Sequence, residues 1–463
     1  MSGSSTIVVV GGGITGLVTA RDLVMAGASV TLVEPGHLGG KLRSTPFAGG
    51  MLDEAADAFL ARVPEGVELC RELGIDGDLV SPAARRAYVW GHGELRLLPE
   101  AQVLGVPTDL DELAASGILS AAGLERARQD LQAPLIAPPD DVAIGAFMRG
   151  RLGDEAVERL IDPLVGGINA GDTDRLSLAA TVPQLDAAAR SGAPSLIEAC
   201  RAQRAAAVDP DAPIFFAPRA GMGALPEAVA TDAVAHGLTV VPARAMDLER
   251  ERRQWRIGLD GGRALQADGV VLATAAHTSA TLLRPHAPNG AALLAGIPYA
   301  SVAMISIAVD PAAIERELDG SGYLVPRIEG RTITACSWAT SKWPHLTVDG
   351  TVLLRVSIGR DGDDRALSLS DDALVTAALA DLRDTMALRG EPREVRVTRW
   401  PSSFPQYRPG HLDRVAKLET DLATALPSVE VAGAALRGLG VPACIRQGRA
   451  AASRLLATLD ARP

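Results

Sequence analysis

The stretch Ile7-Val8-Val9-Val10-Gly11-Gly12-Gly13-Ile14-Thr15-Gly16 lies near the start of the chain and indicates its fold. Its four β-branched residues predict a buried parallel strand, which runs directly into a Gly-x-Gly-x-x-Gly pattern. A helical pattern follows and ends at Gly27, and a second apolar strand over residues 30–33 ends on Glu34. Strand, glycine turn, helix, strand and terminal acid in this order predict a βαβ unit that binds a dinucleotide.

Each glycine of this pattern has its own role in holding a dinucleotide. Gly11 permits the tight turn, Gly13 lets the backbone approach the pyrophosphate, and Gly16 lets helix and strand pack closely. The free N–H groups at the start of the helix favour phosphate, and Glu34 is placed to accept hydrogen bonds from ribose hydroxyls. The predicted contacts of this unit are Gly11, Gly12, Gly13, Ile14, Thr15, Gly16 and Glu34.

The composition is that of a globular chain without a nucleic-acid surface. Of the 463 residues, 47% are hydrophobic, and the net charge of −11 argues against binding to a polyanion. The four cysteines (Cys70, Cys200, Cys336 and Cys444) lie far apart, and the seven histidines have no metal-binding spacing. We therefore expect reduced thiols, as in a cytoplasmic protein, and no metal site.

Two segments bear on export and on membranes. Residues 1–6 have no basic region and lead straight into the first strand, so we expect no signal peptide there. Residues 290–309 carry no charge and have the length of a spanning helix, but Gly296, Pro298 and Tyr299 interrupt them. We predict a helix, a turn and a strand in this stretch and a cytoplasmic protein, with peripheral association at a membrane surface left open.

The cofactor-binding fold is predicted to be discontinuous. Patterns typical of α/β structure occupy residues 1–75, return at 215–285 and occur again at 396–463. Residues 76–205 are predicted to be a helical insertion, and residues 286–395 a substrate-binding domain dominated by strands. The fold class is therefore α/β with α+β segments: a Rossmann-like domain, a mixed-sheet domain and an inserted helical domain. This layout is typical of a two-domain flavoprotein, since a simple dehydrogenase usually has a contiguous nucleotide unit.

The spacing of apolar residues predicts individual elements within these domains. Helices are expected at 110–131, 142–164, 371–386 and 447–459, and strands at 301–309, 332–338 and 351–358. Two glycine-rich segments, residues 37–43 and 162–172, are expected where the backbone passes close to a ligand.

With these segments the chain resembles the porphyrinogen oxidases of haem synthesis, within the monoamine-oxidase-like flavoproteins. The resemblance runs nearly end to end, and five segments carry it beyond the glycine unit. They are residues 162–177, 216–226, 398–411 with Pro405-Gln406-Tyr407, 438–448 with Gly440-Val441-Pro442, and 334–345. The last is similar to the Gram-positive bacterial branch, which acts on coproporphyrinogen III.

The resemblance implies a monoamine-oxidase/p-hydroxybenzoate-hydroxylase-like architecture and non-covalent FAD. The implied reaction is the oxygen-dependent oxidation of coproporphyrinogen III to coproporphyrin III, with hydrogen peroxide as by-product. Because the flavin performs the hydride step, no side chain is assigned as catalytic. The implied cofactor contacts beyond the first unit are Gly39, Gly40, Lys41, Asp57, Ala58, Val241, Trp400, Gly440, Val441, Pro442 and Ala443. Of these, Val241 would meet the adenine and Trp400 would lie near the flavin. Ala58 and Ala443 depart from the family's usual residues, which weakens individual contacts without removing the site.

The substrate is expected between the helical insertion and the strand domain, with Gly166, Gly167 and Asn169 near its face. Positive side chains should anchor its propionates, because buried carboxylates need paired charges. Arg86 matches a family arginine and is the first candidate for such an anchor, and Lys342 is the second.

Other functions remain open at this point. A protoporphyrinogen IX oxidase would share every FAD motif, whereas a flavin amine oxidase would share only the fold. A non-catalytic protein would bind FAD or a tetrapyrrole without turnover. The expected partners are the tetrapyrrole substrate and molecular oxygen, with the next haem-synthesis enzyme as a further candidate and no nucleic acid. Monomer and homodimer are both compatible with the sequence.

Overall fold

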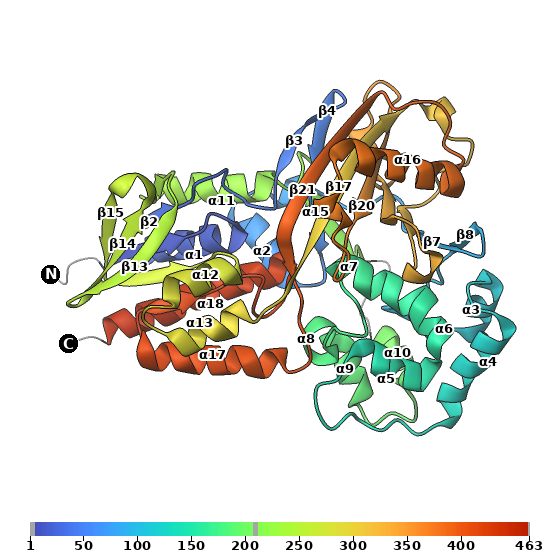
Figure 1. Cartoon of the computed structure of the whole chain (residues 1–463), viewed down its shortest axis with the longest axis horizontal. Helices are drawn as coiled ribbons and strands as arrows, with labels where there is room; N and C mark the ends of the chain where they lie inside the picture. The colour runs from blue at the N-terminus through green and yellow to red at the C-terminus, as the bar shows by residue number, and fades with distance from the viewer. Residues whose placement is uncertain (1–4, 207–211, 462–463) are drawn as a thin grey trace.

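The computed structural model describes residues 5–206 and 212–461. Residues 1–4, 207–211 and 462–463 lie outside this range, and with them most of the segment considered as a signal peptide. Figure 1 shows the cofactor-binding sheet and its helices on the left, a second large sheet at the upper right and a helical region at the lower right.

A five-stranded parallel sheet forms the centre of the cofactor-binding domain. Its order is β12-β2-β1-β16-β22, so the first strand of the chain lies in the middle. The strands come from all three segments predicted for this domain: β1 (Thr6–Val10), β2 (Ser29–Val33), β12 (Thr239–Val241), β16 (Gly269–Leu272) and β22 (Val429–Val431). The predicted Rossmann-like fold class is therefore confirmed, and the carboxyl ends of these strands meet at one edge.

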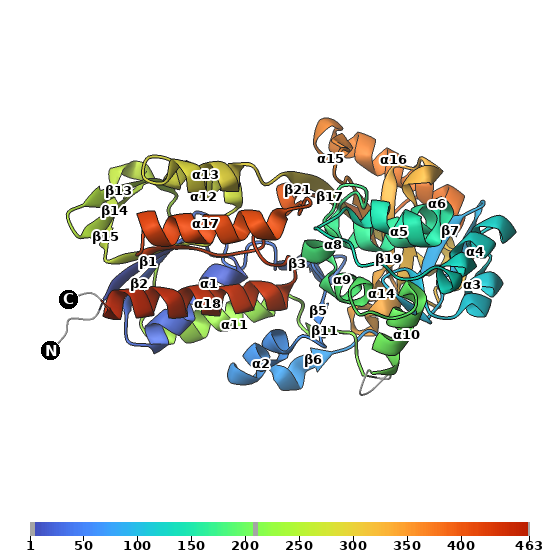
Figure 2. The ribbon, with the colours of Figure 1, turned by 90° about the horizontal axis from the view of Figure 1, so that it is seen from below.

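Both faces of this sheet are covered, as the unbroken run of buried side chains in β1 requires. Ile7 and Val9 pack against α1 (Ile14–Met25), α11 (Ala224–Ala235) and α18 (Val441–Asp460). Val8 and Val10 point the other way, toward a second layer of strands and helices (Figure 2). That layer consists of β13 (Ala245–Glu251), β14 (Gln254–Leu259), β15 (Ala264–Ala267), α12 (Ala276–Leu283), α13 (Pro288–Ala295) and α17 (His411–Ala425).

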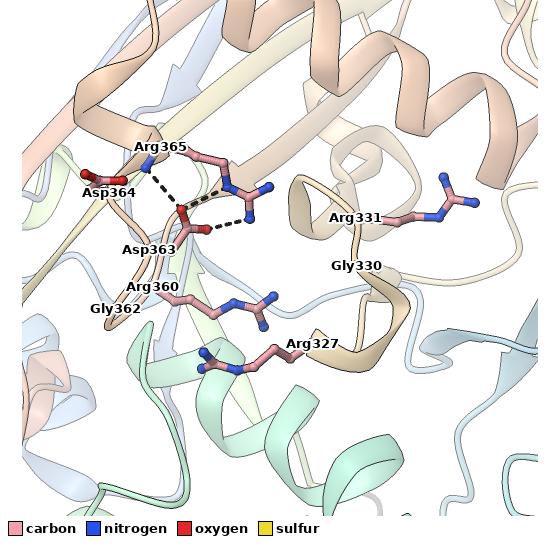
Figure 3. Close-up of a pocket in the computed structure, with 8 residues that line it drawn as sticks. All are labelled: Arg327, Gly330, Arg331, Arg360, Gly362, Asp363, Asp364 and Arg365. Atoms are coloured by element: carbon pink, nitrogen blue, oxygen red, sulfur yellow. Dashed lines mark hydrogen bonds and ion pairs between the residues drawn. The ribbon is translucent and has the colours of Figure 1, made fainter.

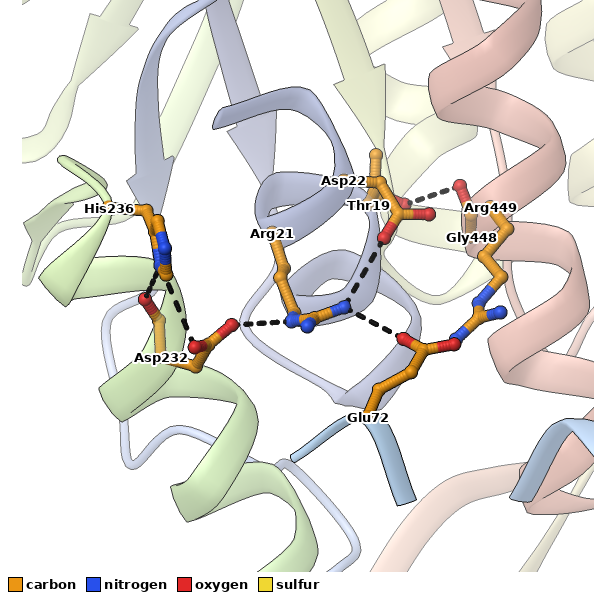
Figure 4. A network of polar contacts seen from close by, with 8 residues as sticks. All are labelled: Thr19, Arg21, Asp22, Glu72, Asp232, His236, Gly448 and Arg449. Carbon is orange, nitrogen blue, oxygen red and sulfur yellow. Dashed lines mark hydrogen bonds and ion pairs between the residues drawn. The ribbon is translucent and has the colours of Figure 1, made fainter. Parts of the chain in front are cut away.

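An arginine on α1 ties this helix to its neighbours (Figure 4). Arg21 Nε donates to Asp232 on α11 at 2.6 Å, and its Nη1 donates to Glu72, the last residue of α2 (Pro64–Glu72), at 3.0 Å. Its side chain is only 11% exposed. Arg449 on α18 reaches the other oxygen of Glu72 at 2.7 Å. Four helices from three distant parts of the chain thus share one charge network.

We expect Arg21→Met to lower the free energy of unfolding by about 2 kcal/mol, because it leaves Asp232 and Glu72 without their buried partner. Thermal and urea unfolding of the FAD-loaded protein measure this change. The matched control is Arg71→Met, whose side chain is 65% exposed and lies 3.9 Å from Asp76. Exposed pairs of that kind contribute about 0–1 kcal/mol, so equal stability of the two variants would contradict the importance of the network.

A seven-stranded mixed sheet forms the second domain, in the order β21-β17-β20-β19-β18-β7-β8. Helices α15 (Arg365–Ser368) and α16 (Asp371–Met386) pack on one of its faces. The strands are β21 (Glu394–Pro405), β17 (Tyr299–Val309), β20 (Val352–Ile358), β19 (Ile333–Trp338), β18 (Gly322–Leu324), β7 (Tyr88–Gly91) and β8 (Glu94–Leu97).

Two of these strands come from the range that the sequence predicts to be helical. β7 and β8 form a hairpin whose turn residues, His92 and Gly93, both have positive φ. Four-residue strands give too short a pattern to stand out in a helical region. In addition, β21 runs across the predicted boundary at residue 396, so residues 396–405 extend the second sheet rather than the cofactor domain.

The helical region has its own apolar core and is more broken than predicted. The stretch 110–131 divides at Gly117, which has positive φ, and the stretch 142–164 divides at Gly153 for the same reason. A π-helical segment, η3 (Val157–Gly166), contains Pro163, which cannot donate a helical hydrogen bond. The helices are α3 (Leu110–Ser116), α4 (Ala121–Arg128), α5 (Ile144–Leu152), α6 (Asp154–Ala156), α7 (Gly167–Asn169), α8 (Leu178–Thr181), α9 (Pro183–Ala189) and α10 (Leu196–Ala205).

The other predicted elements are confirmed. The helix expected at 371–386 is α16, and the three predicted strands are β17, β19 and β20. Residues 290–309 form most of α13, a turn and all of β17. Across residues 5–206 and 212–461, no helix combines the length and apolar character needed to cross a bilayer. The remaining strands, in short sheets, are β3 (Ser44–Phe47), β4 (Gly50–Asp53), β5 (Phe59–Leu60), β6 (Leu79–Val80), β9 (Gln102–Val103), β10 (Val106–Pro107) and β11 (Phe215–Pro218).

Candidate functional site

The glycine turn after β1 forms an open cradle at the carboxyl edge of the parallel sheet. Gly11 has φ +108°, and a Cβ on Gly16 would lie 1.9 Å from the Gly11 carbonyl oxygen, so neither position accepts a side chain. A Cβ on Gly13, by contrast, would meet no described atom within 4 Å. No described side chain caps the start of α1, where the backbone of Ile14 and Thr15 begins the helix. The cradle therefore offers unobstructed backbone N–H groups.

A second glycine pair packs on this cradle. The Gly39 N–H donates to the Gly12 carbonyl at 2.7 Å, and Gly39 and Gly40 have φ of +102° and +60°. A Cβ on Gly40 would come within 3.3 Å of the Gly13 Cα. The glycine cradle of residues 11–16 and the glycine-rich segment 37–43 thus lie against each other.

Glu34 is fixed at the end of β2 by backbone donors. Its carboxylate accepts from the Gly12 N–H at 2.8 Å and from the Gly36 N–H at 2.9 Å. Its own N–H donates to the carbonyl of Val241 at 3.1 Å. The residues predicted for the ribose and for the adenine are therefore neighbours at one edge of the sheet.

The last helix contributes a second uncapped N-terminus to the domain. Gly440 precedes α18, whose first turn holds Val441, Pro442 and Ala443, and within the described chain no side chain caps it. A Cβ on Gly448 would lie 2.6 Å from the Thr15 carbonyl oxygen, so α18 packs directly against the start of α1. Pro442 fits this position because a first-turn residue needs no N–H partner, and the helix accordingly begins six residues before the predicted 447.

Lys41 and Trp400 bring the second glycine segment into contact with β21. Lys41 Nζ donates to the Ser403 carbonyl, and Trp400 Nε1 donates to the Glu54 carbonyl at 3.1 Å. Burial lowers the pKa of Lys41, because the charged ammonium has lost most of its water. The two predicted flavin neighbours therefore lie at the junction of both sheets.

Asp57 occupies a charged cluster at the same junction. Its Oδ2 lies 2.9 Å from Lys342 Nζ, 3.2 Å from Arg355 Nη1 and 3.4 Å from Trp343 Nε1. Burial raises the pKa of Asp57, but the charges of Lys342 and Arg355 outweigh it and hold that pKa well below its usual range. Asp57 is thus an anion at all physiological pH values. Its neighbour Ala58 packs on the core of the cofactor domain.

The predicted substrate segment meets the second sheet. A Cβ on Gly167 would lie 3.5 Å from Leu324 of β18, while a Cβ on Gly166 would meet Asp162 and Gly171. The Asn169 carbonyl accepts from Gln406 Nε2 at 3.0 Å. Tyr407, the next residue, accepts at its hydroxyl from the Gly438 N–H at 3.0 Å. The Pro405-Gln406-Tyr407 segment therefore joins the substrate segment to the loop before α18.

The two predicted propionate anchors both have carboxylate neighbours of their own. Arg86 is 58% exposed and lies 3.6 Å from Asp319, and Lys342 belongs to the Asp57 cluster. The role of these two residues as propionate anchors stays a prediction. Sequence reasoning missed Arg355, although an arginine in the middle of the apolar strand 352–358 is itself a signal, because a buried charge needs a partner.

The described residues contain no group of three or more His, Cys, Asp or Glu side chains arranged to hold a metal ion. The four cysteines are buried and free. Burial raises the pKa of Cys70 to about 11, so this thiol is protonated at neutral pH. The polar chemistry of the site is therefore that of backbone N–H groups, arginines, lysines and acids.

Comparison with known proteins gives one family and full-length relatives. The flavin containing amine oxidoreductase family matches residues 14–456. The chain is 34% identical to the coproporphyrinogen III oxidase of Bacillus subtilis, over 99% of both chains. It is 28% identical to the chloroplastic protoporphyrinogen oxidase 1 of Arabidopsis thaliana, over 90% of this chain and 81% of that one.

Among solved structures, the chain is similar to a protein from Exiguobacterium sp. 255-15 that is provisionally named protoporphyrinogen oxidase. The TM-score is 0.87 at 30% identity, over 99% of this chain and 100% of the other. The glycine cradle, the fixed Glu34 carboxylate and the open space at Gly13 fit the pyrophosphate and ribose of FAD, the cofactor of this family. The chain belongs to the flavin containing amine oxidoreductases and, within them, to the porphyrinogen oxidases.

Proposed function

We propose that this protein oxidises coproporphyrinogen III to coproporphyrin III. The observation that carries this proposal is the similarity, over 99% of both chains, to a protein named coproporphyrinogen III oxidase. Other relatives with that name are 30–35% identical over at least 98% of this chain. The cradle for the cofactor and a glycine-rich segment facing the second sheet are compatible with a flat tetrapyrrole beside a flavin.

FAD, when bound, supplies the acceptor for the hydride equivalents removed from the substrate. The cradle residues Gly11, Gly13 and Gly16 hold its pyrophosphate, and Glu34 holds its ribose. Lys41 and Trp400 lie at the flavin end. Gly166, Gly167 and Asn169 form the wall over the substrate. Molecular oxygen is the final acceptor, and hydrogen peroxide is the expected product.

The test is aerobic turnover of coproporphyrinogen III and protoporphyrinogen IX in parallel, followed by porphyrin fluorescence and peroxide release. We expect a kcat/KM about tenfold or more in favour of coproporphyrinogen III, because a site built for carboxylates loses binding energy with vinyl groups. Air oxidation without enzyme, and the protein stripped of FAD, are the controls.

Protoporphyrinogen IX oxidation is the second candidate, because the Exiguobacterium and Arabidopsis relatives carry that name. A kcat/KM in favour of protoporphyrinogen IX would select it. Peroxide formation from amines but not from porphyrinogens would contradict both candidates and favour an amine oxidase. A yellow protein that neither porphyrinogen reduces would instead be a binding protein.

We also propose that the enzyme is cytoplasmic and passes coproporphyrin III to the next enzyme of haem synthesis. Fractionation with and without membranes, together with light scattering for the oligomeric state, tests this part separately from turnover.

A further inference from the structure

A pocket of about 380 Å³ opens among the loops that follow strands β18 and β20 of the second sheet (Figure 3). Four arginines line it: Arg327, Arg331, Arg360 and Arg365. Arg327 follows β18, and Arg360 follows β20, so the two reach the pocket from different loops of the same sheet.

Two of the four arginines are neutralised by neighbouring acids. Arg365 forms a two-pronged pair with Asp363, at 2.9 and 2.7 Å. Arg331 is bound to Asp381 and Asp384, at 3.2 and 2.9 Å. Neither guanidinium is therefore free to bind an anion in the pocket.

Arg327 and Arg360 are different, because their guanidinium groups extend into the same space (Figure 3). Arg327 donates to the Gly171 carbonyl at 3.2 Å and lies 3.9 Å from Asp172. The Arg360 guanidinium has no carboxylate or carbonyl within hydrogen-bond distance in residues 5–206 and 212–461. The adjacent Asp361 pairs with Arg175 and Arg408 instead.

The acids near Arg360 do not fully neutralise the positive charges of Arg327 and Arg360. Burial and the like charge of Arg327 lower the pKa of Arg360, while Asp162 and Asp363 act in the opposite direction from a distance. Asp162 already accepts from Thr173, and Asp363 is paired with Arg365. The remaining acid of the lining, Asp364, is exposed. Two facing guanidiniums with no acid between them are the arrangement that a carboxylate or phosphate group satisfies.

The pocket adjoins the segment assigned above to the face of the tetrapyrrole. Arg327 binds the Gly171 carbonyl, and Asp361, next to Arg360, donates its N–H to the Ala170 carbonyl at 2.8 Å. Gly167 packs against Leu324, three residues before Arg327. A flat ligand lying on residues 166–169 thus has the arginine pair at its rim.

We propose that Arg327 and Arg360 form a carboxylate-binding subsite that takes one propionate arm of the tetrapyrrole substrate. This inference rests on the proposed function and gives the anchoring role to residues other than Arg86 and Lys342. A guanidinium fork matches a carboxylate, and the pair lies where a ring at the glycine-rich segment would extend its side chains.

The test is titration of coproporphyrin III, which is stable in air, into the FAD-loaded protein and its Arg327→Gln and Arg360→Gln variants. We expect each substitution to weaken binding about tenfold or more, as for loss of a charge-assisted hydrogen bond. The KM for coproporphyrinogen III should rise in parallel while kcat changes little. Arg360→Lys, which keeps the charge but not the fork, should fall between wild type and Arg360→Gln.

Two comparisons isolate the carboxylate. The tetramethyl ester of coproporphyrin III has no carboxylate, so wild type and variants should bind it equally. Arg263→Gln makes the same change in net charge on an exposed residue of the β14–β15 connection and should bind coproporphyrin III like wild type.

Unchanged affinity of both arginine variants for coproporphyrin III would overturn the inference. The inference would also be overturned if the pocket bound only a free anion. In that case phosphate would raise the thermal stability of the wild type but not of Arg360→Gln, and the substitution would leave porphyrin binding unchanged. If the variants do not fold, equal affinity of the wild type for the acid and its ester would overturn it. A wild type that binds coproporphyrin III through these arginines but does not oxidise coproporphyrinogen III would reject the proposed function and leave the subsite standing.

Discussion

The Gly13→Ala protein should fold like wild type and yet lose its FAD. Gly13 has φ −71° and ψ 173°, which alanine adopts freely, and its Cβ would point into space that no described atom fills. Under the proposed assignment this space receives the pyrophosphate, so a methyl group there would displace the ligand. We expect FAD affinity to fall about a hundredfold, which corresponds to about 3 kcal/mol.

Gly16→Ala should damage the fold as well as the binding of FAD. Its Cβ would lie 1.9 Å from the Gly11 carbonyl oxygen, and backbone on both sides prevents relaxation. We expect a loss of about 1 to 3 kcal/mol in the stability of the apoprotein, as for other overpacked positions. Gly150→Ala is the matched control, because its Cβ on the exposed side of α5 meets no described atom within 4 Å.

Flavin absorbance after purification, FAD titration of the apoproteins and their thermal unfolding measure these effects. A Gly13→Ala protein with wild-type affinity for FAD would contradict the assignment of the cradle. A Gly16→Ala apoprotein as stable as Gly150→Ala would contradict the packing argument.

Asp57→Asn should be the most destabilising of the charge substitutions at the junction of the two sheets. It leaves Lys342 and Arg355, whose side chains are 17% and 5% exposed, facing each other without an anion. We expect a loss of about 2 kcal/mol, less than for a fully buried pair because Asp57 keeps some solvent and asparagine keeps a hydrogen bond. The double variant Asp57→Asn/Lys342→Met should recover part of this loss, because it removes one of the two orphaned cations.

The pH dependence of this loss gives an independent check. The pKa of Asp57 is lowered in the folded state, so its contribution is fully present above the unfolded pKa of about 4 and disappears as the pH falls below it. The difference in stability between wild type and Asp57→Asn should therefore be constant from pH 5 to 8 and shrink in more acidic buffer. The control Glu391→Gln breaks an ion pair whose acid is 79% exposed and should change stability little. If the difference in stability between wild type and Asp57→Asn did not shrink below pH 4, the ion-pair explanation would be contradicted.

The sequence predicted the cofactor domain well because its signals are local. The strand, the glycines and Glu34 lie within one short stretch. In the second domain, the apolar periods of 301–309 and 371–386 likewise need no partner to be recognised. The hairpin of β7 and β8 was missed because it is stabilised by β18, more than two hundred residues later. Tertiary pairing therefore decided the structure there.

The charged clusters were predicted least well, for a related reason. Asp57 meets Lys342 and Arg355 across almost three hundred residues of chain, and nothing near Asp57 in sequence indicates these partners. Lys342 was expected to hold a propionate because its type is suitable, but only the fold shows an acid beside it. The same holds for Arg327 and Arg360, which the fold brings together from separate loops.

The parallel sheet takes its strands from distant parts of the chain, and this order affects folding during synthesis on the ribosome. Strand β22 and helix α18, which complete the cofactor domain, leave the ribosome more than four hundred residues after β1. Until then, the first βαβ unit lacks the helix that packs Gly448 against Thr15, and one face of α1 has nothing to cover it. The growing chain must therefore keep an apolar surface exposed during most of its synthesis, and FAD can be captured firmly only after nearly all of the polypeptide has emerged.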